Sequence, residues 1–326
     1  MLKMGMVSKW HVHAEGYAND IAQSGLAEIA AVWDENPVRG AAWAQQIGTS
    51  FFEDYDAFLE QVDGICCTSP TTLHPDLLKK AALAKKHIFT EKLLAINTDT
   101  CRELCKLIES AGKTFTIALP CKCDSTVQYV KNLTQSGKLG TITGARFRRS
   151  HSGVSNRWLP DDWFNIEFSG GGAMMDLGAH PVYILADLFG FPKTVSCLMS
   201  NIYGTSNMRS DENAIAVMRF EHGILATAET AFVTDYVPDL LEVYGTEGAV
   251  YMRGGEVTQS LKCEGGKPRM LSLDELPAQK PSPLLQFLAR ANDGLPGAPD
   301  GLDLQSALMM TQIIELAYLS NGGVYQ

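Results

Sequence analysis

The feature that most constrains the fold is a regular alternation of strand-like and helix-like segments over residues 1–119. Apolar, β-branched runs predict strands at residues 3–7, 28–33, 49–52, 64–68, 87–90 and 114–118. Helical patterns separate them at residues 12–24, 37–47, 55–61, 75–85 and 99–111. Strands joined through helices pair in parallel, because a tight hairpin cannot connect parallel neighbours. We therefore expect a doubly wound, Rossmann-type α/β domain at residues 1–119.

The pattern changes after Pro120, where helices at 125–136, 283–292 and 303–319 frame a run of strands at 143–149, 194–202, 213–220, 224–233, 240–244, 249–252 and 256–261. Short Gly-containing turns between consecutive strands predict antiparallel pairing. We expect an α+β domain at residues 120–326 with a large open, mainly antiparallel sheet. One sheet face needs a cover, and a homo-oligomer (dimer or tetramer) is the expected one. The residues expected on that face are Ala226, Ala228, Thr230 and Phe232.

Composition excludes several classes of function. The 326 residues carry a net charge of −10, so no basic surplus exists to bind nucleic acid. No apolar run reaches transmembrane length, and the first residues are interrupted too early for a signal peptide. The eight cysteines are irregularly spaced, which favours reduced thiols in a cytoplasm over a disulfide framework. Cys121 and Cys123 lack a partner pair at zinc-finger spacing, so no metal site is expected.

A second chemical signal is the run Gly170-Gly171-Gly172 followed by Asp176 and His180. If the run is helical, the carboxylate and the imidazole lie on one face within hydrogen-bonding reach. A carboxylate held against an imidazole makes a proton acceptor at neutral pH. The alternative is a glycine turn that leads into a core helix with a satisfied histidine.

Glu91 and Lys92 directly follow the strand at 87–90, at the edge where doubly wound sheets bind ligands. With the glycine run, Asp176, His180 and the domain order, they resemble the glucose–fructose oxidoreductase / inositol dehydrogenase / MocA (Gfo/Idh/MocA) family over essentially the whole chain. The segment 68–74 resembles that family's loop on the nicotinamide side of the cofactor. The resemblance implies NAD(P)-dependent oxidation or reduction of a sugar, cyclitol or related polyol.

In this family the residues at three positions form the catalytic set: Lys92, Asp176 and His180. His180 would be the general base during oxidation, Asp176 its orienter and Lys92 the donor to a developing alkoxide. The expected cofactor-binding residues are Ser8, Trp10, His11, Asp34, Thr68, Ser69, Pro70, His74 and Glu91. The expected substrate-binding residues are Arg157, Trp158, Trp163 and Asn165, although the two tryptophans equally fit a role in packing the loop.

Asp34 ends the second predicted strand, where a carboxylate accepts hydrogen bonds from adenosine ribose hydroxyls. Neither Glu35 nor Asn36 is basic, which favours NAD over NADP. The alternative is that Asp34 only caps the turn before Pro37.

Two departures from the family stand out. The first strand runs into residues 8–13 without any glycine, where the family has a glycine-rich phosphate loop. Side chains of Ser8, Lys9 and His11 would then replace backbone donors, or Trp10 would plug the site. Leu93 follows Lys92 where the family has proline, so a trans peptide bond is expected there.

Three functions compete at this point. The first is an NAD-dependent sugar or polyol dehydrogenase. The second is an enzyme that retains NAD and cleaves glycosidic bonds by transient oxidation and elimination. The third is a non-catalytic sensor, which the presence of Lys92, Asp176 and His180 disfavours.

Overall fold

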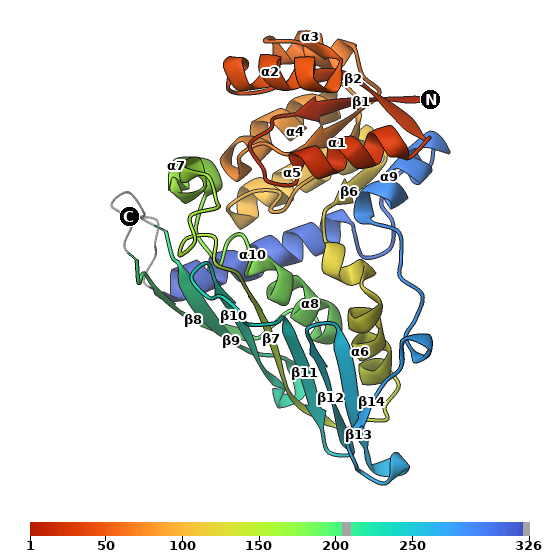
Figure 1. Cartoon of the computed structure of the whole chain (residues 1–326), viewed down its shortest axis with the longest axis vertical. Helices are drawn as coiled ribbons and strands as arrows, with labels where there is room; N and C mark the ends of the chain where they lie inside the picture. Colours follow the sequence, from red (N-terminus) through yellow and green to blue (C-terminus); the bar gives the residue numbers. More distant parts are fainter. Residues whose placement is uncertain (204–209, 322–326) are drawn as a thin grey trace. The chain divides into compact units, whose positions relative to one another are not determined.

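The computed structural model describes residues 1–203 and 210–321, and the chain divides into two compact units (Figure 1). The first unit comprises residues 1–119 and 281–311, and the second comprises residues 120–280 and the described residues from 312. The division after Leu119 falls where the sequence pattern changes. Residues 281–311, however, return to the first unit, whereas the sequence pattern placed everything after residue 119 in the second.

The first unit is a parallel six-stranded sheet with helices between its strands. The strands are β1 (Leu2–Val7), β2 (Ala27–Trp33), β3 (Ser50–Phe51), β4 (Gly64–Cys67), β5 (His87–Thr90) and β6 (Phe115–Ile117). The helices are α1 (Ala14–Gln23), α2 (Pro37–Ile47), α3 (Tyr55–Glu60), α4 (His74–Leu83), α5 (Thr98–Ala111) and α9 (Pro283–Asn292), with a 3₁₀ turn at Thr71–Leu73. The strand order β3-β2-β1-β4-β5-β6 confirms the predicted doubly wound fold and places its topological switch between β1 and β4.

Strand β1 shows how the two faces of this sheet are filled. Met4 and Met6 are fully buried in a cluster that includes residues of α1, α2 and α9. The alternate residue Gly5 points to the other face, where the Phe58 ring of α3 would lie 2.3 Å from an added Cβ. A side chain at position 5 is therefore excluded by the helix that covers this face.

The returning segment completes the first unit through both packing and hydrogen bonds. Phe287 and Leu288 of α9 are fully buried in the same cluster as β1. Farther along, the amides of Phe115 and Ile117 in β6 donate to the carbonyls of Gly297 and Leu302 at 3.0 and 3.1 Å. The sheet edge at β6 is thereby paired with chain that comes from far along the sequence.

The second unit is built on an eight-stranded sheet. Its strands are β7 (Ile142–Ser150), β8 (Thr194–Ser200), β9 (Asn213–Arg219), β10 (Leu225–Ala231), β11 (Leu240–Gly245), β12 (Gly248–Arg253), β13 (Glu256–Leu261) and β14 (Arg269–Met270). Its helices are α6 (Ser125–Gln135), α7 (Ile166–Ser169) and α8 (Ala179–Phe189), while α10 (Leu304–Ser320) contributes residues to both units. Short 3₁₀ turns lie at Pro120–Cys123, Asp161–Phe164, Glu221–Gly223, Lys262–Glu264 and Leu273–Glu275.

The order of this sheet is β14-β13-β12-β11-β7-β10-β9-β8, and every pair is antiparallel except β7 with β10. The predicted open, mainly antiparallel sheet is thus confirmed. Helix α8 packs on β7 and β10, and α6 packs on β11 and β12.

The prediction of which side chains line the uncovered face was wrong. The residues named for it are at most 2% exposed, so they face the covered side: Ala226, Ala228, Thr230 and Phe232. Because the side-chain period of a strand is two, the neighbouring positions face outward instead. Leu225 is 55% exposed, and Leu198 of β8 and Ile215 of β9, directly paired, are 78% and 45% exposed.

No helix in the described part of the chain is long and apolar enough to cross a membrane. All eight cysteines are free thiols, and Cys263 is the exposed one among them.

Candidate active site

A first group of predicted site residues lies at the carboxyl ends of β1, β4 and β5, where hydrogen bonds join the loops that follow these strands. The Thr68 hydroxyl donates to the carbonyl of Ser8 at 2.6 Å, and the amide of His11 donates to the carbonyl of Thr68 at 3.1 Å. The amide of Glu91 donates to the carbonyl of Cys67 at 2.9 Å. Parallel strands bring their carboxyl ends to one edge, so these predicted site residues meet there.

The loop at residues 8–13 takes an unusual backbone conformation without glycine. Ser8 has a φ of 71°, a left-handed conformation that costs a residue with a Cβ about 1–2 kcal/mol. Its hydroxyl accepts a hydrogen bond from the amide of Trp10 at 3.0 Å and another from Arg39 at 3.3 Å. The Trp10 side chain is buried, at 8% exposure. Hydrogen bonds to the Ser8 side chain and burial of the Trp10 side chain thus stabilise the conformation of this loop.

The carboxylate of Asp34 is buried and surrounded by donors. It accepts from the amides of Lys9 and Asn36, each at 2.8 Å, and from two guanidinium nitrogens of Arg39 at 2.7 and 3.0 Å. Arg39 also pairs with Glu35. Burial raises the pKa of Glu35, and the charge of Asp34 raises it further.

Arg39 is a residue that the sequence analysis missed, because only the two positions after Asp34 were considered. Asn36 caps α2 by accepting from the Arg39 amide at 3.1 Å, so Arg39 lies in the first turn of this helix. The sequence contains this capping pattern. The contact of the Arg39 side chain with Asp34, however, depends on how the first turn of α2 lies relative to the end of β2.

Lys92 is buried at 5% exposure, directly after Glu91. The peptide bond between Lys92 and Leu93 is cis, so the expectation of a trans bond was wrong. The expectation of a trans bond considered only the local energy cost of a cis peptide bond. In the structure Leu93 is buried, and its carbonyl oxygen is held by tertiary contacts.

Those contacts come from His74, which is fully buried at the start of α4. Its Nδ1 lies 2.6 Å from the carbonyl oxygen of Leu93 and its Nε2 lies 3.1 Å from that of Ser69. Both partners can only accept, so both ring nitrogens carry hydrogen. Burial by itself would lower the pKa of His74, but its interaction with Cys67 raises that pKa above its ordinary value. His74 therefore joins the loop after β4 to the residue after Lys92.

A second group of predicted site residues is in the second unit, around the glycine run. Residues 173–178 form consecutive turns and α8 begins only at Ala179, so the expectation of one helix carrying Asp176 and His180 was wrong. The reason is a packing contact: the amides of Ala173 and Met174 donate to the carbonyl and carboxylate of Asp211 at 2.8 and 2.7 Å. These bonds bind the segment to another part of the chain instead of to its own helix.

The glycines serve the same packing. A Cβ on Gly172 would lie 2.0 Å from the carbonyl oxygen of Asp211, and one on Gly171 would lie 2.5 Å from the hydroxyl of Tyr318. The amide of Gly172 donates to that hydroxyl at 2.9 Å. The close approach that the glycines allow is therefore to the protein's own core.

His180 is 5% exposed in the first turn of α8. Its Nδ1 lies 2.9 Å from the hydroxyl of Tyr183 and 3.5 Å from the Sγ of Cys121. The Tyr183 oxygen also accepts from the amide of Cys121 at 3.0 Å. Burial, followed by the effect of Cys121, raises the pKa of Tyr183 well above its ordinary value, so the phenol stays protonated. If Nδ1 carries hydrogen and donates to Tyr183, Nε2 is the nitrogen that can accept a proton.

Arg149 lies next to this pair, with one guanidinium nitrogen 2.6 Å from the Cys121 sulfur and another 3.5 Å from Asp239. Burial raises the pKa of the Cys121 thiol, although Arg149 acts in the opposite direction. The thiol is therefore a protonated, packed neighbour of His180.

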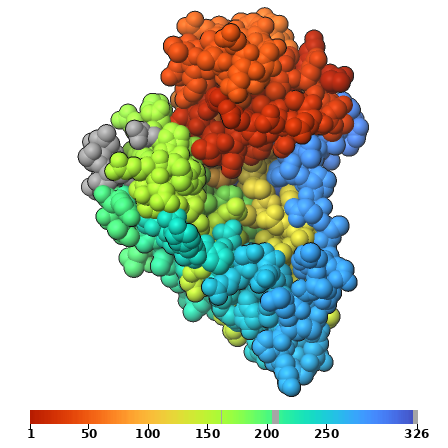
Figure 2. Space-filling model, viewed as in Figure 1, coloured from red at the N-terminus to blue at the C-terminus, as the bar shows by residue number. Residues whose placement is uncertain are grey.

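The predicted substrate-binding residues lie at 157–165, in a segment at the surface of the second unit that is drawn in green in Figure 2. Trp158 is half exposed and packs at 4.7 Å on the ring of His151, and Arg157 is exposed. Trp163 is 4% exposed, and the Asn165 side chain caps α7 by accepting from the amide of Glu167. In the structure Trp163 therefore packs in the interior and Asn165 caps a helix, while the side chains of Arg157 and Trp158 are accessible to solvent.

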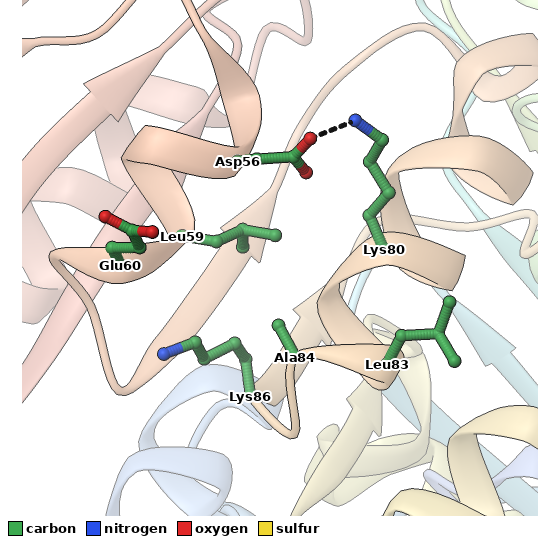
Figure 3. A pocket seen from close by; sticks show the side chains of 7 residues that line it. All are labelled: Asp56, Leu59, Glu60, Lys80, Leu83, Ala84 and Lys86. Atoms are coloured by element: carbon green, nitrogen blue, oxygen red, sulfur yellow. Dashed lines mark hydrogen bonds and ion pairs between the residues drawn. The ribbon is translucent and has the colours of Figure 1, made fainter.

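A surface hollow of about 390 Å³ in the first unit is lined by none of the predicted site residues. Figure 3 shows that α3 and the end of α4 supply its lining, with an ion pair of 2.8 Å between Lys80 and Asp56 across it. It adjoins the segments that lead into β4 and β5, so it lies at the amino ends of the strands. Doubly wound sheets bind ligands at the opposite edge.

Comparison with known proteins finds a matching family model for each of the two units. Residues 8–119 match the model of an oxidoreductase family described as an NAD-binding Rossmann fold. Residues 127–251 match the model of the GFO/IDH/MocA C-terminal domain.

Individual relatives are distant but span most of the chain. A 2,7-anhydro-N-acetylneuraminate hydratase of Escherichia coli (strain K12) is 26% identical over 270 residues, covering 81% of this chain and 71% of the relative. A 1,5-anhydro-D-fructose reductase of Ensifer adhaerens is 23% identical over 256 residues, covering 78% and 76%. Among solved structures, a levoglucosan dehydrogenase in complex with NADH and levoglucosan superimposes with a TM-score of 0.84 at 17% identity, covering 98% and 97% of the two chains.

Proposed function

This chain belongs to the Gfo/Idh/MocA family and is an NAD-binding oxidoreductase of the dehydrogenase type, and from that premise we propose that it oxidises or reduces a carbon bearing a hydroxyl or keto group in a sugar, cyclitol or related polyol. The observation that carries the proposal is the pairing of His180 Nδ1 with the Tyr183 hydroxyl, which supports a role for Nε2 in taking a proton from the substrate. The named relatives that act on anhydrosugars support the substrate class.

The residues of the first unit fit the cofactor. The strand order provides a switch point between β1 and β4, and a carboxylate, Asp34, stands at the end of β2. The amino end of α1 follows β1, and backbone amides at such a helix end suit an anionic pyrophosphate. When NAD is bound, its nicotinamide accepts or supplies the hydride.

The chain's own residues would manage the proton and the charge. During oxidation, His180 takes the hydroxyl proton at Nε2 while Tyr183 holds its ring, and Lys92 donates a hydrogen bond to the substrate oxygen as negative charge develops there. We also propose Asp176 for this set, as the orienter of His180, which is the role that the family resemblance implies. Glu91 and His74 hold the backbone on both sides of Lys92.

An absorbance screen for NADH formation over sugars and cyclitols tests this function, after mass spectrometry of any nucleotide that co-purifies. We expect turnover with at least one polyol. The Lys80→Ala variant, altered at the hollow in Figure 3, serves as the matched control and should keep full activity. Binding of NAD without turnover of any polyol or glycoside would contradict the proposal.

A second candidate is an activity that retains NAD and ends in elimination or hydration, which the E. coli hydratase relative favours. In that case the product would appear without net formation of NADH, and one bound NAD molecule per chain would support many turnovers. Measuring product and NADH in the same sample separates the two functions.

Asp34 and Arg39 yield a prediction about cofactor preference. The carboxylate of Asp34 would accept from a ribose hydroxyl, and Arg39 now pairs with that carboxylate. We expect Asp34→Ala to weaken NAD binding by roughly 10–100-fold, because hydrogen bonds to a charged group are lost. The Arg39 guanidinium, released from Asp34 but still paired with Glu35, should at the same time strengthen binding of NADP, because it can pair with the 2′-phosphate. Titration of both nucleotides checks this. Unchanged NAD affinity would remove Asp34 from the cofactor site.

We also propose that a second copy of the chain covers the outward face of the second unit's sheet. Leu198, Ile215 and Leu225 form an exposed apolar patch, and Arg146 and Glu229 pair beside it at 2.7 Å. A patch that carries both signs of charge can complement itself across a two-fold axis. The eight free thiols support a reducing compartment such as the cytoplasm for the assembly.

Light scattering of Leu198→Glu tests the oligomer. We expect the mutated protein to become monomeric at concentrations at which the original chain is a dimer or tetramer, since a buried apolar contact would be replaced by a charge. Leu83→Glu is the matched control, because Leu83 is 62% exposed on the first unit. An oligomer that persists in Leu198→Glu would place the interface elsewhere.

A further inference from the structure

We propose that His11, His13 and Glu91 form a binding site for a divalent transition-metal ion of the zinc class. One ligand atom from each of the three residues lies within 4.8 Å of the others. Two of the residues come from the glycine-free loop after β1 and the third from the end of β5. Two imidazoles and one carboxylate are a donor set that zinc takes when a coordination position is left open. The proposal stands on these residues alone and does not depend on the proposed function.

The carboxylate at the centre is buried and oriented. The Glu91 side chain is 2% exposed and receives hydrogen bonds from the Tyr17 hydroxyl and, at 3.2 Å, from the amide of Lys92. A buried carboxylate that is fixed by outer hydrogen-bond partners is preorganised for a cation.

The distances require only small movements. His13 Nδ1 lies 2.8 Å from Glu91 Oε1, and His11 Nε2 lies 3.9 Å from Glu91 Oε2. Ligand atoms that share a tetrahedral zinc ion are about 3.4 Å apart, given bond lengths near 2.1 Å. The two distances, one to each oxygen of the carboxylate, lie on either side of this value, so the three side chains are close to coordinating range.

Access and tautomer also bear on the site. The His13 side chain is 48% exposed, which gives the ion a path from solvent and leaves a position for water. The Nδ1 of His11 accepts a hydrogen bond from the amide of His13 at 3.2 Å. Binding at Nε2 would move the ring hydrogen to Nδ1 and give up that bond, which is long and therefore weak.

The test titrates the full-length chain with zinc by calorimetry and with cobalt by visible absorption. Both use a Cys263→Ser background, which removes the exposed thiol. We expect one ion per chain, cobalt d–d bands without a thiolate charge-transfer band, and a raised melting temperature with zinc. His13→Ala should weaken binding at least 100-fold, and Tyr17→Phe by about 10–100-fold. His222→Ala, which alters an exposed histidine of the second unit, is the matched control and should bind like the background protein.

Failure to bind zinc or cobalt would overturn the site, as would equal affinity in His13→Ala. A thiolate charge-transfer band would assign the ion to cysteines instead. Glu91→Gln is a further test. If this buried change prevents folding, His13→Ala still decides the matter because its side chain is half exposed.

Discussion

Replacing His180 with alanine is expected to lower kcat/KM by about 10²–10⁴-fold on the substrate that the screen identifies, because that is the range a positioned proton acceptor contributes. His180 is buried beside Tyr183 in the second unit, whereas Asp34 and the loop at residues 8–13 belong to the first. NAD affinity, measured by fluorescence titration, should therefore stay within about twofold. Full activity in His180→Ala would remove this histidine from the mechanism.

Tyr183→Phe distinguishes proton transfer from simple packing. The change removes the hydroxyl beside Nδ1 but keeps the ring, so we expect a drop of about tenfold in kcat, corresponding to one hydrogen bond. The pH profile of kcat should move too, since the ring loses the partner that sets its tautomer. A variant with lower stability but an unmoved pH profile would show that Tyr183 acts only as packing.

Gly172→Ala should cause a large loss of stability for the addition of a single methyl group. The added Cβ would lie 2.0 Å from the carbonyl oxygen of Asp211. A backbone atom at that distance cannot move away as easily as the end of a flexible side chain can. Overpacking of this kind costs about 1–3 kcal/mol, and here the turn that leads into α8 must shift with it. Thermal unfolding should show a clearly lower melting temperature.

Gly16→Ala is the matched control for that experiment. Gly16 lies inside α1, and nothing would lie within 4 Å of its added Cβ. Alanine is the better helix former, so we expect a stabilisation of about 0.5–1 kcal/mol. If both variants unfolded at the same temperature as the original chain, the close contact between Gly172 and Asp211 would not exist in the folded protein.

The features predicted well are those that local patterns determine. The alternation of strands and helices predicted all six parallel strands, and α2 begins at Pro37 and ends at Ile47 as expected, because proline and a following glycine mark its ends. The carboxyl-end edge could be predicted as well, because parallel strands have only one such edge.

The errors come from interactions between distant segments. The turns before α8 depend on Asp211 and Tyr318, which lie far along the chain from Gly172. The outward face of β10 depends on which side α8 covers, and an alternating pattern of alanine and threonine fits either side. The assignment of Arg39 to Asp34 required the position of the first turn of α2.

The return of residues 281–311 to the first unit has a consequence for how the protein is made. A chain released at residue 119 would expose the surface that α9 covers with Phe287 and Leu288, both fully buried in the finished fold. On the ribosome, the nucleotide-binding unit begins first but cannot close until residues 281–311 emerge, after residues 120–280 have already been made. A truncated gene for the first unit should therefore yield aggregated product. Joining residues 1–119 to 281–311 through a short linker is the route to a soluble one.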